Sequence, residues 1–140
     1  MAAQTLVSRT MVRQGEEKVL GAFRNHLELK GKSKHTVDAY CSDMGVYAAW
    51  AGQRYGEGFD LAMFNRSDLQ VFFREQTKEL GVSPATWNRR RAALRVFAAW
   101  AQEQGLINYD PTDSLPKVEE TELAPLWITG REYGKLRGSM

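Results

Sequence analysis

The chain has 140 residues, of which 43% are hydrophobic and 26% are charged, and its formal net charge is +2. This composition indicates one globular domain with its own core and excludes a disordered chain. The single cysteine, Cys41, excludes a disulfide framework within the chain. Residues 1–15 lack the apolar stretch of a secretory signal. No run approaches the ~18 apolar residues that span a membrane.

Hydrophobic periodicity predicts helices in the first half of the chain. After a loose tail over residues 1–14, apolar residues at helical spacing predict a first helix over 15–30, which ends at Gly31 in a left-handed conformation. Ser33 is predicted to cap a second helix that reaches to about Gly52. The glycine-rich residues 52–64 are predicted to form a loop.

The second half repeats this arrangement. Asn65 or Ser67 is predicted to cap a third helix that ends at residues 80–81. Ser83 is predicted to cap a fourth helix, with Pro84 in its first turn and Gly105 after its end. With no strand pattern among these elements, the predicted fold class is all-α: four main helices arranged as two αα-hairpins.

The remaining residues are predicted to lie outside this bundle. Residues 117–125 read as an acidic linker, and residues 126–138 as a short strand or turn followed by a helical turn or two. The predicted domains are therefore a tail over 1–14, a helical domain over 15–116, and a linker with the start of another domain over 117–140.

Residues 31–51 and 81–101 resemble each other. They share Gly, Ser and Thr around the helix start and an Ala-Ala-Trp-Ala run at the helix end: Gly31 and Gly81, Ser33 and Ser83, Thr36 and Thr86, 48–51 and 98–101. Chance agreement between alanine-rich helices is the alternative. The common offset of both starts and both ends favours a true internal repeat.

The second copy is distinguished by its basic residues. Arg89, Arg90, Arg91 and Arg95 stand where the first copy has Ala39, Tyr40, Cys41 and Gly45. No acid between residues 84 and 102 is available within the helix to pair with them. Arginine binds phosphate through two donors, and arginine or asparagine on a helix can reach base edges. We therefore predict that these arginines and Asn88 bind nucleic acid; a solvated charged face is the alternative.

The two helix starts are a second candidate for DNA contact. Free N–H groups at a helix N-terminus bind phosphate. The expected contacts are Lys32, Lys34, His35 and Thr36 in the first copy, and Ser83 and Thr86 in the second. Plain capping is the alternative; it requires only Ser33 and Ser83, so the recurrence of the two threonines favours a further role. His35 lacks a partner for metal binding or catalysis, and no metal, cofactor or catalytic site is predicted.

These motifs resemble the core-binding, SAM-like N-terminal domain of tyrosine recombinases, the phage-integrase and Xer/Cre-type enzymes. The resemblance covers about residues 16–137. It rests on Ser33, Thr36, Tyr40, Asp43, Tyr47 and Trp50 in the second helix, on Ser83, Thr86, Arg89, Arg90, Leu94, Arg95 and Phe97 in the fourth, and on residues 65–69, 108–111, 115–117 and 125–136. Arg91 departs from the family, which usually has an apolar residue there.

The resemblance implies an orthogonal four-helix SAM-like bundle that forms half of a clamp on a recombination half-site, with the second and fourth helices near the major groove. The implied partners are double-stranded DNA, a separate C-terminal catalytic domain and sister recombinase protomers. That domain would supply the catalytic residues without metal or nucleotide. We therefore expect a fragment that is not itself an enzyme, from a cytoplasmic recombinase of bacterial or phage origin.

Two other functions stay open at this point. A SAM-like domain can mediate protein–protein interaction without DNA binding, through exposed apolar surface. A helix-turn-helix regulator would use the turn between the third and fourth helices, from Gly81 to Pro84. It is less favoured, because the second helix is too long and too similar to the fourth.

Overall fold

The computed structural model describes residues 18–120. A first helix over residues 18–29 precedes α2 (Lys34–Tyr55), the short 3₁₀ turn η1 (Leu61–Met63) and α3 (Arg66–Arg74). The π-helical turn η2 (Glu75–Glu79) extends α3, and α4 (Pro84–Glu103) completes the bundle. The described residues contain no strand, which confirms the all-α class. The predicted tail over 1–14 and the end of the chain after residue 120 lie outside the described residues.

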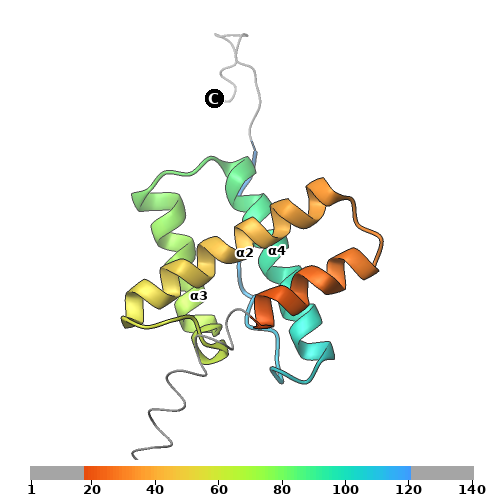
Figure 1. Cartoon of the computed structure of the whole chain (residues 1–140). Helices are drawn as coiled ribbons and strands as arrows, with labels where there is room; N and C mark the ends of the chain where they lie inside the picture. Colours follow the sequence, from red (N-terminus) through yellow and green to blue (C-terminus); the bar gives the residue numbers. More distant parts are fainter. Residues whose placement is uncertain (1–17, 121–140) are drawn as a thin grey trace, which may run out of the picture.

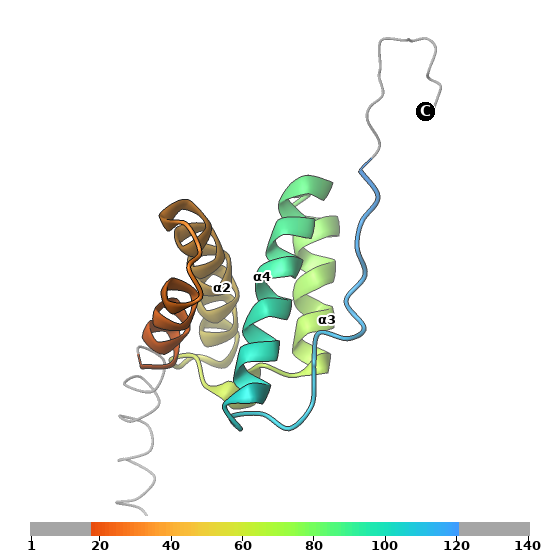
Figure 2. The ribbon, with the colours of Figure 1, turned by 90° about the vertical axis from the view of Figure 1, so that its right-hand side faces the viewer.

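The helices form two hairpins that pack across each other (Figure 1). The first helix and α2 make one hairpin, α3 and α4 the other, and α2 crosses α4. Both α2 and α4 begin at the same end of the molecule, the upper end in Figures 1 and 2. Gly31 and Gly81 connect the helices in the left-handed conformation, with φ of 81° and 65°. The loops before α2 and α4 therefore reverse the chain in the same way.

The internal repeat is present in the geometry of the two helix starts. The capping residues Ser33 and Ser83 have φ of −65° in both cases and ψ of 157° and 155°. At each cap the serine hydroxyl accepts the Thr N–H at 3.1 Å and donates to the Thr hydroxyl at 3.0 Å. Thr36 and Thr86 are thus part of the caps, in the place of the acidic residue of a capping box. The serines make the capping bond itself, and the threonine hydroxyls add a bond to the serines, so the recurrence of the threonines has a local structural reason.

Two predicted boundaries differ from the structure. α2 continues past Gly52 to Tyr55 and ends at Gly56, whose φ is 75°. Gly52 has a different role: the loop folds back so closely that a Cβ there would lie 2.7 Å from the Glu57 carbonyl oxygen. α3 is short, because its last turns adopt the π-helical η2 and reach only Glu79. Its cap is Asn65, whose side chain accepts the Asp68 N–H at 2.8 Å.

The core is built from aromatic side chains contributed by every helix. Tyr47 packs edge-on against Phe72 with ring centroids 5.0 Å apart, and Phe64 packs the same way against Phe97. Trp100 is buried, whereas Trp50 is only partly buried and donates its Nε1–H to Glu75 at 2.9 Å. The large side chains with no exposed surface are Phe23, Met44, Tyr47, Leu69, Phe72, Trp87, Leu94 and Phe97. This core fixes the relative positions of α2 and α4.

Candidate nucleic-acid interface

The start of α2 presents exposed basic residues. Lys32, Lys34 and His35 are exposed, and the first turn of the helix contains no acidic residue. Lys34 forms an ion pair with Asp38 at 2.9 Å, and Asp38 also accepts a hydrogen bond from Arg24 at 2.8 Å. These bonds, that of Arg24 first, lower the pKa of Asp38. The N-terminus of α2 therefore combines the positive end of the helix dipole with cationic side chains.

The start of α4 has the same geometry without the lysines. Ser83 and Ala85 are exposed, Thr86 is half-buried, and no acid occupies the first turn. The two starts lie at the same end of the bundle (Figure 2). Two helix N-termini without an acid in the first turn lie at this end and are suited to bind phosphate groups, although the Glu120 carboxylate accepts a bond from Asn88 of α4 at 3.1 Å.

Arg89 is held by an acid from the other helix of the repeat. Its Nε and Nη2 donate to the two carboxylate oxygens of Asp43 on α2 at 2.8 and 2.9 Å. The Asp43 side chain is only 1% exposed, whereas that of Arg89 is 53% exposed. The hydrogen bond from Arg89 to Asp43, with their charge attraction, raises the pKa of Arg89. Arg89 therefore keeps a fixed position while part of its guanidinium stays open to solvent.

Arg90 faces inward. Its Nε lies 3.4 Å from Asp43, its Nη1 donates to the buried Gln76 of η2, and its side chain is only 19% exposed. Arg90 thus neutralises Asp43 from the second side and joins α2, η2 and α4. Little of the Arg90 side chain is therefore accessible to a ligand.

Asn88 and Arg91 hold the segment that follows the bundle. Arg91 Nε donates to the Leu115 carbonyl at 2.8 Å, and the Asn88 side chain bonds to both backbone groups of Val118. Trp87 Nε1 donates to the Pro116 carbonyl at 2.9 Å. Burial lowers the pKa of Arg91. Residues 112–120 consequently run beside α4 toward the end where it begins (Figure 2).

Arg95 differs from the other three arginines. It is exposed, and no ion pair or side-chain hydrogen bond to it occurs within residues 18–120. The four predicted arginines thus lie in four different environments: Arg89 is held but half-exposed, Arg90 is enclosed, Arg91 bonds to the segment after the bundle, and Arg95 is exposed. Its uncompensated charge is the one that a phosphate would attract most strongly.

Sequence reasoning named Asp43 only as part of the family resemblance and missed that it pairs with the arginines of α4. The absence of acids between residues 84 and 102 is correct, but the acid comes from α2, 46 residues before Arg89. A signal was present in the sequence: Asp43 lies beside Met44 on the half of α2 that carries the apolar residues, where an unpaired carboxylate would be costly. Its arginine partners could have been sought in the basic copy of the repeat.

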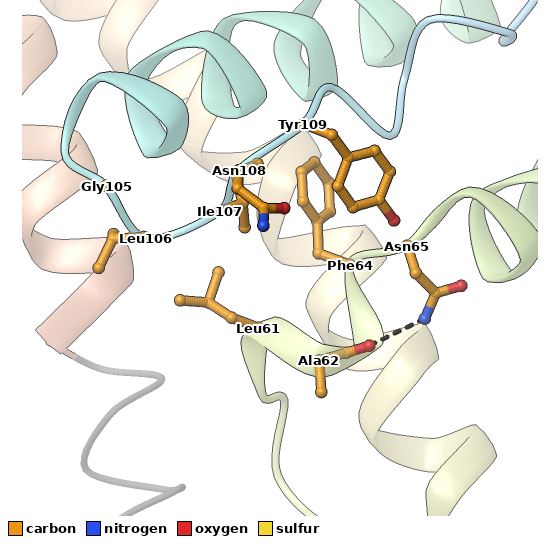
Figure 3. A pocket seen from close by; sticks show the side chains of 9 residues that line it. All are labelled: Leu61, Ala62, Phe64, Asn65, Gly105, Leu106, Ile107, Asn108 and Tyr109. Carbon is orange, nitrogen blue, oxygen red and sulfur yellow. Dashed lines mark hydrogen bonds between the residues drawn. The ribbon is translucent and has the colours of Figure 1, made fainter.

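A concave surface lies at the end of α4 opposite its start (Figure 3). It is formed between the turn around η1 and the loop after α4, and Asn65 donates to the Ala62 carbonyl at its edge at 2.9 Å. Its lining is mixed: Leu61, Phe64, Leu106 and Ile107 are apolar, and Asn65, Asn108 and Tyr109 contribute polar groups. In residues 18–120 no group of His, Cys, Asp and Glu is arranged to hold a metal ion. None of the helices described there is long and apolar enough to cross a membrane.

The helical bundle and its repeated, capped helix starts define a SAM-like helical domain. A family model described as phage integrase, N-terminal SAM-like domain, matches residues 20–105. This match spans more than half of the chain, so the chain belongs to that family, and the resemblance found in the sequence is confirmed.

The curated relatives are tyrosine recombinases. XerC of Xylella fastidiosa (strain M23) is 36% identical over 91 residues, which are 64% of this chain and 29% of that protein. XerC of Mycobacterium sp. (strain KMS) is 35% identical over 108 residues, 75% of this chain and 35% of that protein. The chain therefore spans about a third of the length of these relatives. No solved structure gives a significant match.

Proposed function

We propose that this chain binds double-stranded DNA as the core-binding domain of a site-specific tyrosine recombinase. It would form half of a clamp on the recombination site, and the other half would be the catalytic domain of the parent protein. The observation that carries the proposal is the position of the two helix starts: α2 and α4 begin at one end of the bundle, and neither has an acid in its first turn. Membership of the integrase family supports the same reading.

The proposed contacts are divided between the two copies of the repeat. The start of α2 would bind the DNA backbone through Lys32, Lys34, His35 and Thr36. The start of α4 would do so through Ser83 and Thr86, with Arg89 and Arg95 reaching further into the site. Arg90, Arg91 and Asn88 would act indirectly, because they bond to Asp43, Gln76 and the segment 115–118 within the domain.

The proposal assigns DNA binding, and not strand cleavage, to this chain. The relatives are named tyrosine recombinases, so we propose that the full-length parent cuts and rejoins DNA in the bacterial cytoplasm, in an assembly of sister protomers. The segment 115–120 supports this arrangement. It runs toward the end where α4 begins, and would lead a following catalytic domain to the same duplex.

Salt-dependent binding to a duplex tests the proposal. Fluorescence polarisation with a labelled 20-base-pair duplex of mixed sequence should give micromolar or weaker affinity at physiological salt. With roughly 4–7 phosphate contacts, affinity should fall by about a hundredfold or more between 50 and 200 mM salt. The Arg89→Ala/Arg95→Ala variant should bind more weakly and with a smaller salt slope. An unchanged affinity in this variant would refute the assigned surface.

A matched control removes two positive charges elsewhere. Lys18 is the first described residue of the first helix, and Arg66 is the first residue of α3. The starts of these two helices lie away from the starts of α2 and α4 (Figure 1). The Lys18→Ala/Arg66→Ala variant changes the net charge equally. It should weaken binding much less than the Arg89→Ala/Arg95→Ala variant does.

Protein–protein interaction is the second candidate function. Leu29 and Leu80 are 80% and 70% exposed, and each lies just before the loop that leads to α2 or α4. Exposed leucines favour contact with another protein surface. Light scattering with and without duplex separates the two functions. Self-association that does not respond to DNA would support the second.

A further inference from the structure

Asp43 is a buried carboxylate whose ion-pair partners are both arginines of α4. Its side chain is 1% exposed, and it bonds to Arg89 and Arg90. Burying a carboxylate is unfavourable unless it is paired and hydrogen-bonded. Arg90 already supplies one enclosed partner. Asp43 also pairs with Arg89, whose side chain is 53% exposed. This ion pair therefore determines where the Arg89 guanidinium lies on the proposed DNA surface.

The bidentate contact leaves a defined part of Arg89 free. Nε and Nη2 face Asp43, at 2.8 and 2.9 Å. A guanidinium has five N–H donors in one plane, so those on Nη1 and the second on Nη2 remain at the far end of the fork. Two parallel bonds fix both the position and the plane of the group. Arg89 therefore offers a pair of donors whose direction is set before any ligand arrives.

Arg89 and Arg95 differ in how far their positive charge is compensated by an acid. Asp43 shares its single negative charge between Arg89 and Arg90, so it offsets part of the charge of Arg89 and weakens the attraction of Arg89 for phosphates. Arg95 is exposed, and within the described chain it has no acidic partner. Attraction to the DNA backbone grows with uncompensated charge, whereas base recognition depends on donors held in a fixed geometry.

The neighbours of Arg89 on α4 are small. Ala85 lies one turn before it and Ala92 three residues after it, on the same side of the helix. Ala85 is exposed and Ala92 is half-buried. Short side chains at these positions allow the helix to approach a base edge closely, so that the fixed donors of Arg89 could reach it.

We infer that Asp43 positions Arg89 as the side chain of α4 that recognises a guanine, while Arg95 supplies attraction to phosphate. The inference rests on the proposed DNA-binding function and deepens it. Arginine donates two bonds to guanine O6 and N7, and such a pair discriminates against the wrong base by roughly 5- to 150-fold. Asp43 acts through Arg89 and is a positioning residue.

Selection from a pool of duplexes with 12 randomised positions tests the inference, using the full chain at 50 mM salt. The wild-type chain should enrich a motif that includes a fixed G·C pair. Asp43→Asn and Arg89→Lys should each reduce the preference for that pair to less than about threefold. The Asp43→Asn/Arg89→Lys variant should lose no more of the G·C preference than either single variant, because both changes disrupt the same contact between Asp43 and Arg89. Arg95→Ala should keep the motif and bind all duplexes more weakly.

Asp43→Asn also separates positioning from simple electrostatics. The change removes one negative charge and so raises the net charge by one, and attraction to DNA alone would predict tighter binding and an unchanged motif. Asp113→Asn is the charge-matched control, because Asp113 also accepts two bonds from an arginine, Arg66, away from the α2 and α4 starts. It should retain the G·C preference. If Asp43→Asn does not fold by circular dichroism, Arg89→Lys carries the test, since it leaves the charge and the exposed position unchanged.

The outcomes distinguish the two proposals. A wild-type chain that binds no duplex in a salt-dependent manner would refute the proposed function, and the inference with it. A wild-type chain that binds duplexes without sequence preference, or an Arg89→Lys variant that keeps the full motif, would refute the inference alone. Loss of the G·C preference in Arg95→Ala would assign the reading role to Arg95 instead.

Discussion

Asn88 on α4 and Val118 in the following segment bond to each other as two paired strand residues would. Asn88 Nδ2 donates to the Val118 carbonyl at 2.7 Å, and Asn88 Oδ1 accepts the Val118 N–H at 2.8 Å. Trp87 and Arg91 bind the carbonyls of Pro116 and Leu115. All three side chains contact the backbone of the segment, while its Leu115 side chain is buried in the core and its Glu120 carboxylate accepts a further bond from Asn88 at 3.1 Å. Backbone and side-chain contacts together fix its path.

Replacing Asn88 should release this segment without unfolding the bundle. In Asn88→Ala the Val118 N–H loses its acceptor, a loss of roughly 1 kcal/mol, so its amide should exchange about fivefold faster. Hydrogen exchange of residues 115–120 measures the effect. Asn25→Ala, an exposed change on the first helix, is the control and should leave the exchange unchanged. Unaltered protection in Asn88→Ala would show that Trp87 and Arg91 suffice to hold the segment.

The helices and caps could be predicted because their signals are local. Ser33 and Ser83 precede apolar periodicity, and Gly31 follows it, so a few neighbouring residues determine each boundary. The end of α2 was misplaced at Gly52, because glycine is also used where another backbone segment approaches closely. That approach involves the carbonyl of Glu57, and it depends on how the loop folds back. No periodicity in the sequence reports it.

Two glycines of α2 should therefore respond in opposite ways to the same substitution. At Gly45 a Cβ would meet nothing within 4 Å, so Gly45→Ala should stabilise the domain by roughly 0.5–1 kcal/mol through helix propensity. At Gly52 a Cβ would lie 2.7 Å from a backbone oxygen, so Gly52→Ala should destabilise by about 2 kcal/mol. Urea unfolding measures both. Equal effects of the two substitutions would contradict the close approach at Gly52.

The candidate site was predicted less completely, for a physical reason. The charge of α4 is visible in its sequence, but the partners of its arginines lie on other elements: Asp43 on α2, Gln76 on η2 and the carbonyl of Leu115. A helical wheel shows which residues share a face of one helix. It does not show what the neighbouring helix places opposite that face, which the aromatic core decides.

The enclosed and the free arginine of α4 should differ in their effect on stability. Arg90→Met removes a partner from the buried Asp43 and leaves the buried Gln76 side chain without its donor, so we expect a loss of about 2 kcal/mol. Arg95→Met changes an exposed side chain and should stay within about 0.5 kcal/mol of the wild type. The free energy of unfolding in urea tests the pair. A larger loss at Arg95 than at Arg90 would contradict the assigned roles.

The two caps should contribute equally, because their geometries agree. Ser33→Ala and Ser83→Ala each remove the acceptor of a Thr N–H at the start of a long helix, and each should lower the free energy of unfolding by about 1 kcal/mol. The effects should add, because the caps belong to different helices and share no partner. Ser42→Ala, an exposed change within α2, is the control and should cause little loss. If only one of the two variants lowers the free energy of unfolding, the caps share a geometry but only one of them stabilises the fold. Weaker duplex binding in either cap variant, with the helices intact by circular dichroism, would tie that helix start to phosphate contact.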